Sequence, residues 1–334
     1  MSRTRTIFAI LLFLASIGIS LPLVAGMLGR VHPAFDSFAH FRWHLSLAMI
    51  AVSLLLLATR FRLHGLLSGA LGVAALWTTL PGMGFGGGQA AADDSESSAI
   101  YRLLQLNLRF NNPEVGTVLS LIGRTKPDVV TLNEVSAHWQ PHLEKLAPMY
   151  PYRTVCGSPG IVGGVAILSR RPLAPGQFVH CNDAGGLATA RIDFGGRWVD
   201  IGAMHLHWPW PFQQPAHIKA LSPQLSELGE TALLAGDLNA ATWSAAVETV
   251  AAASGTTPVE GIGATWLTPL LPQILIDYMG LPIDHVFWKG GIVLRSVTRQ
   301  EHVGSDHLPV LVEFSLSDRP GDSGDTVAIA LLRN

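Results

Sequence analysis

The sequence predicts an α/β protein in which two sheets pack face to face with helices outside, preceded by three transmembrane helices. Three observations lead to this fold class. Three long runs within the first 85 residues lack charged side chains. From residue 100 onwards, segments with strand-like alternation are interleaved with segments of helical spacing. Polar residues follow several of the apolar strand segments, which suits a layered α/β domain with a site at its edge.

The composition and the distribution of charge narrow the class of protein. The 334 residues are 49% hydrophobic and only 14% charged, against about 25% charged residues in a typical soluble domain. This excludes a disordered chain and a coiled coil. Residues 1–92 carry a net charge of +5, with Asp36 as their one acid, and the remaining residues carry −7. An acidic domain is a poor electrostatic match for a long polyanion, so nucleic acid is disfavoured as a partner.

The three uncharged runs are residues 6–29, 43–59 and 63–85. The first is long enough to cross a hydrocarbon layer of about 30 Å as a helix, and the second, with 17 residues, is near the lower limit. A cleaved signal peptide is the alternative for the first run, and a buried core helix is the alternative for the second. We expect residues 1–85 to form a three-helix membrane anchor.

The arginines around these runs predict the orientation. Arg3 and Arg5 precede the first run, and Arg60 and Arg62 lie in the turn between the second and the third. Both basic loops should lie in the cytoplasm. Because three spans are an odd number, the rest of the chain should lie outside. The sequence therefore predicts a multi-pass protein of the cytoplasmic membrane with its C-terminal domain on the extracytoplasmic side.

Residues 86–99 are rich in Gly, Ala, Ser and acidic residues and predict a flexible tether. Residues 317–334 predict a loose C-terminal tail, which leaves residues 100–316 as the soluble domain. The two cysteines, Cys156 and Cys181, both fall in this domain. An oxidising compartment would let them pair, and two unpaired buried thiols are the alternative.

The soluble domain begins with an alternating strand and continues with a segment of helical spacing and a β-branched buried strand. Later in the chain, Gly195 and Gly196 indicate a hairpin turn between two strands. Helices are predicted at 113–126, 138–147, 214–230 and 243–253. Strands are predicted at 100–108, 128–135, 152–155, 164–169, 188–194, 198–205, 232–239, 283–288 and 307–316.

Several carboxylate, amide and imidazole side chains follow apolar strand segments. An apolar strand that delivers such a group at its end is a common way to build a rigid site. Each residue alone also fits an ordinary role as a cap, a turn or a solvated strand end, and the conjunction carries the information. The residues are Asn107, Glu134, His205, Asp237, Asn239, Asp284, Asp306 and His307.

In this order, the segments that hold these residues resemble the endonuclease/exonuclease/phosphatase superfamily, which includes DNase I-like nucleases, sphingomyelinases and inositol-polyphosphate phosphatases. The resemblance covers about residues 100–316 and implies a four-layer α/β sandwich. Its most specific segments are GDLNA and GSDHLPV. The matching segments are QLN at 105–107, LNE at 132–134, GGVAILSR at 163–170, MHLH at 204–207, GDLNA at 236–240, PIDHVF at 282–287 and GSDHLPV at 304–310.

The resemblance implies a catalytic set for phosphoester hydrolysis, which needs in-line attack by water and stabilisation of charge on the phosphoryl oxygens. Asp237 would orient or deprotonate the water, and Asn239 would hold the phosphate. His205 and His307 would donate hydrogen bonds to the phosphoryl oxygens. Asp284 would fix the tautomer of His307 and raise its basicity.

The resemblance also implies a metal site. Glu134 is the leading ligand, with Asn107 and Asp306 nearby, and such oxygen ligands suit Mg²⁺, with Mn²⁺ as the alternative. Zinc is disfavoured because the site histidines, His205 and His307, come one per strand end without HxxxH spacing between them. Two departures from the family pattern concern this region. The common LQE is LNE here, and the first motif has Arg109 where some members carry an acid, so that Arg109 would face a phosphate.

The expected activity is that of a metal-dependent hydrolase acting on a lipid-linked phosphate, phosphodiester or pyrophosphate. The stretch Trp208–Phe212, just after His205, would enter the lipid interface, and packing in the core is its alternative. The three-span architecture resembles VanJ-type members of the superfamily, thought to act on undecaprenyl pyrophosphate. A membrane-anchored DNase I-like endonuclease is the first alternative. A non-catalytic membrane binding or sensor module is the second.

Overall fold

The computed structural model describes residues 3–85, 99–157 and 161–317. Of the predicted tether at 86–99 and tail at 317–334, all but one residue each lie outside the described residues. Residues 99–317 form two mixed six-stranded sheets. The first has the order β11 (Ile292–Arg299), β12 (Val310–Leu316), β1 (Tyr101–Asn107), β2 (Val129–Val135), β4 (Gly164–Ser169) and β3 (Tyr152–Cys156). The second has the order β5 (His180–Cys181), β6 (Leu187–Asp193), β7 (Trp198–His205), β8 (Ala232–Asp237), β10 (Asp284–Lys289) and β9 (Thr257–Pro258).

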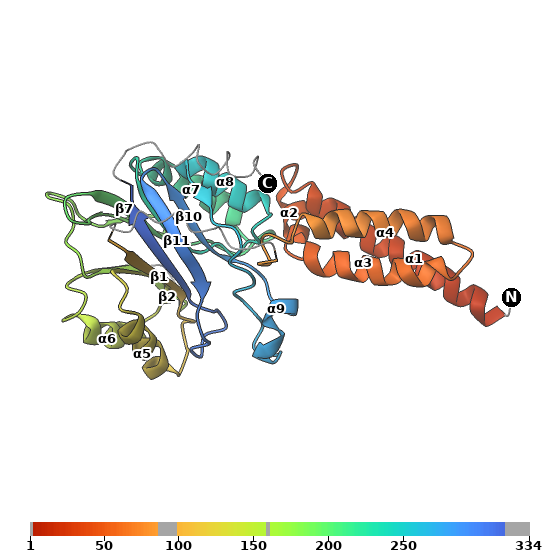
Figure 1. Ribbon diagram of the computed structural model, residues 1–334, viewed down its shortest axis with the longest axis horizontal. Coiled ribbons are helices and arrows are strands. Elements are labelled where there is room, and N and C mark those ends of the chain that lie inside the picture. The colour runs from red at the N-terminus through yellow and green to blue at the C-terminus, as the bar shows by residue number, and fades with distance from the viewer. Residues whose placement is uncertain (1–2, 86–98, 158–160, 318–334) are drawn as a thin grey trace.

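The sheets pack face to face, and helices cover both outer faces (Figure 1). The core between the sheets includes Leu103, Val165, Ile201 and Phe314. Helices α5 (Val115–Thr125) and α6 (Gln140–Leu143) bury their apolar faces against the first sheet. Helices α7 (Gln214–Ser226) and α8 (Ala245–Ser254) do the same on the second. The result is the predicted four-layer sandwich.

Each sheet contains one parallel pair of strands near its centre. Strand β1 runs parallel to β2, and β7 runs parallel to β8. The carboxyl ends of parallel strands meet at one edge of a sheet, and residues at those ends therefore become neighbours. Strand β10 runs antiparallel to β8, so that its first residue, Asp284, lies opposite the last residue of β8, Asp237. This arrangement brings polar strand ends from both sheets to one place.

Most predicted elements are present within two or three residues of their expected bounds. The hairpin at Gly195 and Gly196 joins β6 and β7, and both glycines have positive φ angles. Helix α7 ends four residues earlier than predicted, because Gly229 donates its backbone N–H to Asp200 as the chain turns into β8. The elements that the sequence did not predict are short or lie at sheet edges. They are β5, β9, β11, α2 (Pro33–Ala39), α9 (Ile276–Met279) and two 3₁₀ turns.

The N-terminal segment forms a helical bundle of α1 (Arg3–Met27), α3 (Arg42–Leu57) and α4 (Arg62–Trp77). Figure 1 shows the three helices side by side, projecting from one end of the sandwich, with the N-terminus at the far tip. Gly65 and Gly72 on α4 leave almost no room for a Cβ beside α3, so the two helices pack closely. Trp43, at the start of α3, joins an apolar cluster with Leu267 and Leu308 of the sandwich. The bundle and the sandwich are therefore in contact.

The structure corrects the prediction of three transmembrane helices. Among the described helices, α1, with 25 residues, is the one long and apolar enough to cross a membrane alone. Helices α2 and α3 meet at a 65° bend and form a second candidate only if taken together. Helices α3 and α4 have 16 residues each, about 24 Å of length, which is short of a hydrocarbon layer of about 30 Å. Helix α4 stops at Trp77 because the chain turns back to the sandwich, where Gly261 donates to the Pro81 carbonyl.

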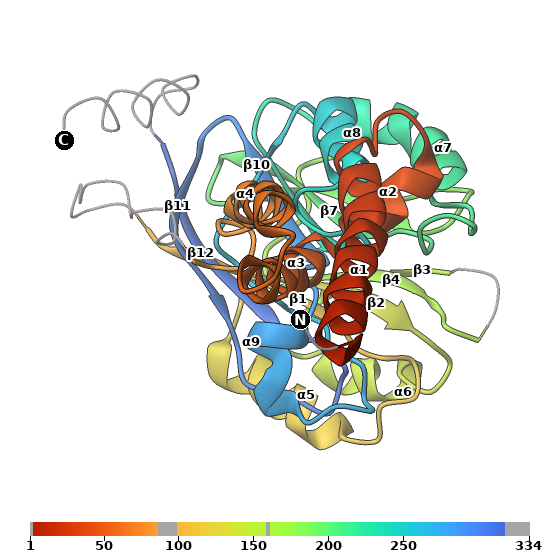
Figure 2. The ribbon, with the colours of Figure 1, turned by 90° about the vertical axis from the view of Figure 1, so that its right-hand side faces the viewer.

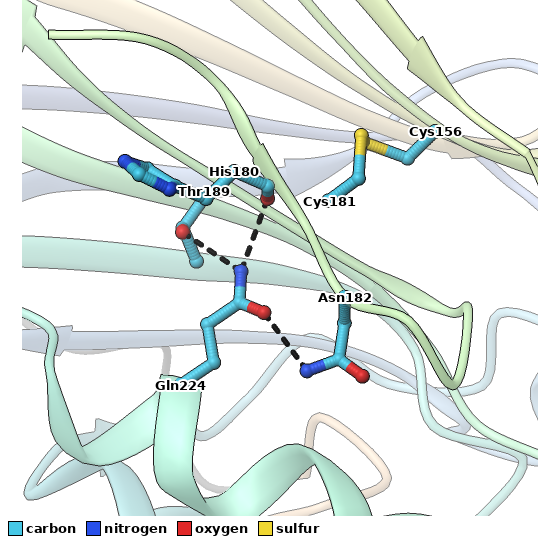
Figure 3. The surroundings of a disulfide bond; sticks show 6 residues. All are labelled: Cys156, His180, Cys181, Asn182, Thr189 and Gln224. Atoms are coloured by element: carbon cyan, nitrogen blue, oxygen red, sulfur yellow. Dashed lines mark hydrogen bonds between the residues drawn. A yellow bond between two sulfur atoms is a disulfide. The ribbon is translucent and has the colours of Figure 1, made fainter.

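Cys156 and Cys181, whose pairing the sequence left open, form a disulfide. The bond links the end of β3 in the first sheet to β5 in the second. Figure 3 shows its surroundings, where the Gln224 side chain donates to His180 and Thr189 and accepts from Asn182. The disulfide and these bonds fasten the short edge strand β5 to the neighbouring elements.

Candidate functional site

The predicted site residues come from both sheets and from the loops that follow their strands. Asn107 ends β1, Glu134 is the second-last residue of β2, His205 ends β7 and Asp237 ends β8. Asp284 begins β10, and His307 lies in the loop before β12. The register pairs His205 with Asp237 across the parallel strands and Asp237 with Asp284 across the antiparallel ones. Strand pairing within each sheet therefore brings some of the site residues together, and the packing of the two sheets brings the two groups of residues together.

His307 lies between two buried carboxylates. Its Nδ1 is 2.8 Å from Asp284 Oδ2, which confirms the predicted hydrogen bond between these residues. Its Nε2 is 3.6 Å from Asp237 Oδ2. The His307 side chain is 5% exposed, and those of Asp284 and Asp237 are 0% and 2% exposed. Charges this well shielded from water interact more strongly than surface pairs.

The carboxylates determine the protonation of His307. Burial alone would lower the pKa of His307, but Asp284 and Asp237 outweigh burial and raise this pKa to about 10. The ring is then an imidazolium at neutral pH. Burial would likewise raise the pKa of Asp284, but His307 holds it below its usual value. Asp284 is therefore ionised and stabilises the charged ring.

Asp237 differs from Asp284 in its protonation. Burial raises the pKa of Asp237 to about 6, with Asp284 adding to the shift and His307 opposing it. The two neighbouring carboxyl groups thus have pKa values shifted in opposite directions, raised for Asp237 and lowered for Asp284. Such opposite shifts accompany acid and base roles in active sites. Asp237 is the group of this pair that can exchange a proton near neutral pH.

Asn107 connects the two sheets at the site. Its Nδ2 donates to Glu134 Oε1 at 3.1 Å and to Asp237 Oδ2 at 2.9 Å. Its Oδ1 accepts from the backbone N–H of Arg109 at 2.9 Å, which fixes the orientation of the amide because a backbone N–H can only donate. The other oxygen of Glu134 accepts from the backbone of Phe110 at 2.9 Å. Asn107, Glu134 and Asp237 are therefore in direct contact.

His205 and Asn239 form the other side of the site. His205 Nε2 is 3.7 Å from Asp237 Oδ2 and 3.5 Å from Asn239 Nδ2. The backbone N–H of Asn239 donates to Asp237 Oδ1 at 2.7 Å, and its side chain donates to the Leu206 carbonyl at 2.9 Å. The His205 side chain remains 16% exposed, so this part of the site can be reached from solvent.

Three site residues have a left-handed backbone. The φ angles of Arg109, Glu134 and Asn239 are 57°, 56° and 48°. Lys126, at the end of α5, is the fourth such non-glycine residue in the described part of the chain. This conformation is unfavourable for residues with a Cβ and persists where surrounding contacts enforce it, commonly at functional sites. The concentration of three such residues at this edge of the sheets supports it as the candidate functional site.

The side chains of two predicted residues lie beside the group without a hydrogen bond to its side chains. Asp306 accepts from the Trp266 indole at 3.3 Å, and its charge contributes to the raised pKa of His307. Arg109 contacts Asn107 through its backbone, and within the described residues its guanidinium has no hydrogen-bond or ion-pair partner. Arg109 is therefore free to meet an anion.

The sequence did not predict the buried hydrogen-bond network of the Gln105 and Asn133 side chains, which supports the site residues. The Gln105 amide donates to Asn133 Oδ1 at 3.1 Å and to Asp284 Oδ1 at 3.0 Å. Asn133 Oδ1 also accepts from the backbone of Asp237 at 3.0 Å, and its Nδ2 donates to the Met204 carbonyl at 2.8 Å. Both amides are fully buried. In the sequence, both amides stand out as polar residues inside otherwise apolar strands. Asn133 is also the residue at which LNE departs from the family's LQE, and it is the residue that joins the two sheets.

The donor set fits a hard divalent cation. Two carboxylates, Glu134 and Asp237, face a single neutral amide nitrogen of Asn107, which offsets their charge only in part. Asp237, Asp284 and His307 also bring potential ligand atoms within 4.8 Å of one another. However, an imidazolium has no lone pair for a metal, and His307 is held in that form. The geometry thus favours a cation at Glu134 and a bound proton at His307.

Comparison with known proteins agrees with this fold and site. The model of the endonuclease/exonuclease/phosphatase family matches residues 104–307, more than half of the chain. Among curated proteins, none matches the chain. D. rerio TDP2 complexed with a single-strand DNA product is 18% identical, with a TM-score of 0.53, and the match covers 65% of this chain and 99% of that one.

An endonuclease/exonuclease/phosphatase from Bacteroides vulgatus is 17% identical, also with a TM-score of 0.53, and the match covers 66% of this chain and all of that one. A family protein from Leptotrichia buccalis is 15% identical, with a TM-score of 0.50 and 65% coverage of this chain. At these identities the structures establish the fold, and the family match extends over every strand end that contributes to the site. The chain therefore belongs to the endonuclease/exonuclease/phosphatase family.

Proposed function

We propose that this protein is a metal-dependent phosphoester hydrolase of the cytoplasmic membrane. Its substrate is a lipid-linked phosphate, phosphodiester or pyrophosphate at the outer face. The observation that carries the hydrolase assignment is the buried series Asp284, His307 and Asp237, in which a charged imidazolium lies 3.6 Å from a carboxyl group of pKa about 6. One group stabilises negative charge and the other accepts a proton, as phosphoester hydrolysis requires.

The residues divide the reaction between them. Asp237 accepts the proton of the attacking water, and Asn107 and Asn239 hold its carboxylate in place. His307 and His205 donate hydrogen bonds to the phosphoryl oxygens as negative charge develops there. Asn239 and Arg109 bind the phosphate. Asp284 keeps the His307 ring charged and oriented.

Glu134 would hold Mg²⁺ or Mn²⁺, with Asp306 and Asn107 alongside, and the cation would offset the charge of the phosphoryl group. For Asn107 to contribute its oxygen, the amide would have to turn away from the Arg109 backbone. Glu134 itself is well placed because two hydrogen bonds, from Asn107 and Phe110, orient its carboxylate. These bonds make the carboxylate a rigid ligand.

The N-terminal helices support a membrane anchor. Large apolar side chains cover the outside of the bundle, among them Leu11, Leu21 and Leu67, which are 58%, 67% and 64% exposed. Monomeric soluble proteins seldom expose so much contiguous apolar surface. If Arg3 and Arg5 lie in the cytoplasm, a crossing by α1 would put the sandwich outside. The disulfide suits that oxidising side.

Two apolar loops beside the site support a lipid-linked substrate. Trp208, Trp210 and Phe212 follow His205 and are 60%, 51% and 61% exposed. Leu270 and Ile274, in the loop that continues from Trp266 to α9, are 91% and 83% exposed. Figure 2 shows α9 on the face from which the helical bundle projects. Both loops would meet the surface of the bilayer that the bundle enters.

The alternatives are weaker on specific grounds. The TDP2 structure bound to a DNA product shows a related fold on nucleic acid, and it keeps an anchored endonuclease as the second candidate. The net charge of −7 after residue 92 disfavours a free polyanion as substrate. A non-catalytic membrane sensor would not need the complete polar set. A membrane anchor followed by a domain of this family would resemble VanJ-type members, and that resemblance would favour a polyprenyl pyrophosphate within the proposed substrate class.

A substrate panel tests this proposal. The full chain in detergent with Mg²⁺ is offered polyprenyl pyrophosphate, sphingomyelin, phosphatidylinositol phosphates and plasmid DNA under identical salt. We expect the lipid-linked phosphates to be hydrolysed faster than DNA. Trp208→Ala with Trp210→Ala should lower turnover of membrane-embedded substrate more than turnover of a short soluble phosphoester. Efficient DNA cleavage without lipid turnover would establish the nuclease alternative, and equal losses on both substrates would show that the tryptophans are structural.

A further inference from the structure

The short helix α2 connects the membrane helices to the site. It lies between α1 and α3 and contacts the segment of the sandwich that follows β8. Trp243 donates its indole N–H to the Ala39 carbonyl at 2.6 Å. Asp36 accepts from the backbone N–H groups of Ala245 and Ala246 at 2.8 and 3.1 Å. These groups begin α8 and would otherwise lack a partner within the helix.

Asp36 and His40 of this helix are both buried. Asp36 is the single acid among the first 92 residues, and it is 7% exposed because α8 covers it. His40, one turn later, is 4% exposed. A buried polar side chain in a connecting segment needs specific partners. Outside α2, the partners of both residues lie in the segment from Asn239 to the first turn of α8.

His40 bonds directly to a site residue. Its Nε2 lies 3.1 Å from the carbonyl oxygen of Asn239, and its Nδ1 lies 3.1 and 3.2 Å from the carbonyl oxygens of Asp36 and Ser37 in its own helix. A carbonyl only accepts, so the bond to Asn239 requires a hydrogen on Nε2. The other donor to this carbonyl is Gln214 Nε2 at 3.3 Å. That amide is also shared with the carbonyls of His207 and Leu238 at 3.0 and 2.9 Å. His40 is consequently the principal donor to Asn239.

The backbone of Asn239 is held at both ends. Its N–H donates to Asp237 Oδ1, and its C=O accepts from His40, while its φ angle is 48°. The first bond restrains φ and the second restrains ψ. Together they hold a left-handed conformation that an asparagine does not favour by itself, and this conformation directs the Asn239 amide toward His205 at 3.5 Å.

We propose that His40 is a positioning residue, by which the membrane-proximal helix α2 holds the phosphate-binding Asn239 in its active conformation. The catalytic site is then completed by a segment outside the family domain, since the family match begins at residue 104. This inference rests on the proposed function for the role of Asn239. It adds that the N-terminal segment sets the geometry of the site as well as its location.

The test compares two substitutions of similar shape in the full chain. His40→Gln places an amide donor near the position of Nε2, and His40→Met has similar length without a donor. We expect His40→Met to lower kcat on a short soluble phosphoester about 10- to 100-fold with little change in KM, because a misplaced catalytic group acts mainly on the transition state. His40→Gln should retain kcat within about threefold. His32 is an exposed histidine at the start of the same helix, where its Nδ1 caps the backbone N–H of Ala34. His32→Asn keeps a capping acceptor there, and as the matched control it should leave both constants unchanged.

A double-mutant cycle identifies the path of the effect. In an Asn239→Ala background, His40→Met should cause almost no further loss, because the side chain that His40 positions is absent. Independent losses in the two backgrounds would overturn the proposal. It would also fail if His40→Met kept the wild-type kcat, or if it unfolded or lost stability without a selective loss of kcat, since the role would then be structural.

Hydrogen exchange gives a readout that does not depend on activity. The backbone amides of residues 239–246 should exchange faster in His40→Met than in the wild type, His40→Gln or His32→Asn. Unchanged exchange in His40→Met would contradict the positioning role. If the wild type hydrolysed no phosphoester, the proposed function would fail while the exchange data still decided whether His40 holds this loop.

Discussion

Replacing Asp284 by Asn should remove the positive charge of the His307 ring while the ring stays in place. The side chains are nearly the same size, and Asp284 is fully buried, so the substitution removes one negative charge 2.8 Å from the His307 ring. It also replaces one of the two acceptor oxygens, which bind Gln105 and His307, by a donor. The shift in the pKa of His307 from 6.5 to about 10 corresponds to roughly 5 kcal/mol in favour of the charged ring. Asp284 contributes most among the three carboxylates that raise this pKa, ahead of Asp237 and Asp306, and its removal should eliminate more than half of the shift.

Burial would then disfavour the charged ring, and only Asp237 and Asp306 would still oppose it. The pKa of His307 should fall toward or below its usual 6.5, and the ring should be mostly neutral above neutral pH. A neutral ring stabilises a developing phosphoryl charge less well, so we expect kcat to fall about 10²- to 10³-fold. The assay is steady-state hydrolysis of a soluble phosphoester at about pH 7.5, with the His307 ring titrated by NMR in the same variant.

Asp200→Asn is the matched control. Asp200 is also buried and paired with a cation, Arg191, but it lies near the start of β7, at the opposite end of the strand from His205. Its substitution should reduce stability without lowering kcat. A near-normal rate for Asp284→Asn, or an unchanged titration of His307, would refute the electrostatic role assigned to Asp284.

Three further predictions concern the disulfide, the metal and the pH dependence. Removing both Cys156 and Cys181 should lower the free energy of unfolding by about 3.5 kcal/mol, from the loop entropy of a 25-residue separation; urea titration of the purified variant measures it, and no change would contradict a formed bond. Glu134→Gln should raise the Mg²⁺ concentration needed for half-maximal activity, and an unaltered Mg²⁺ titration would remove Glu134 from the metal site. Hydrolysis should rise with pH through about 6, since Asp237 must lose its proton to act as a base and burial raises its pKa to about 6; a flat profile across that range would argue against Asp237 as the base.

The sequence predicted the sandwich because its strands are either alternating or continuously apolar, and these patterns depend only on local burial. It predicted the site because strand ends carry polar residues in the family's order. Strand β11 was missed because it is an edge strand paired with β12 alone, and its Arg295, Ser296 and Thr298 weaken the apolar signal. Edge strands need fewer apolar residues than central ones and leave a fainter pattern.

Other features depend on contacts that no local pattern records. Asn133 joins the sheets because β2 faces β7 and β8 across the core, and a single chain shows only a polar residue within an apolar run. His40 and Asn239 are 199 residues apart, and their contact follows from how the helical bundle docks on the sandwich. The number of membrane-spanning helices was overestimated because uncharged runs do not show where a helix ends and the chain turns back.

The most direct test of the central claim is phosphoester hydrolysis by the wild type and by Asp237→Asn. Both proteins would be purified as the full chain, shown by circular dichroism and thermal melting to be folded, and assayed with Mg²⁺ on the best substrate of the panel. Asp237 contacts Asn107, Asn239, His205 and His307, so it lies at the centre of the proposed reaction. The account predicts hydrolysis by the wild type and loss of turnover in Asp237→Asn, with the fold retained. Near-normal hydrolysis by a folded Asp237→Asn variant would contradict it.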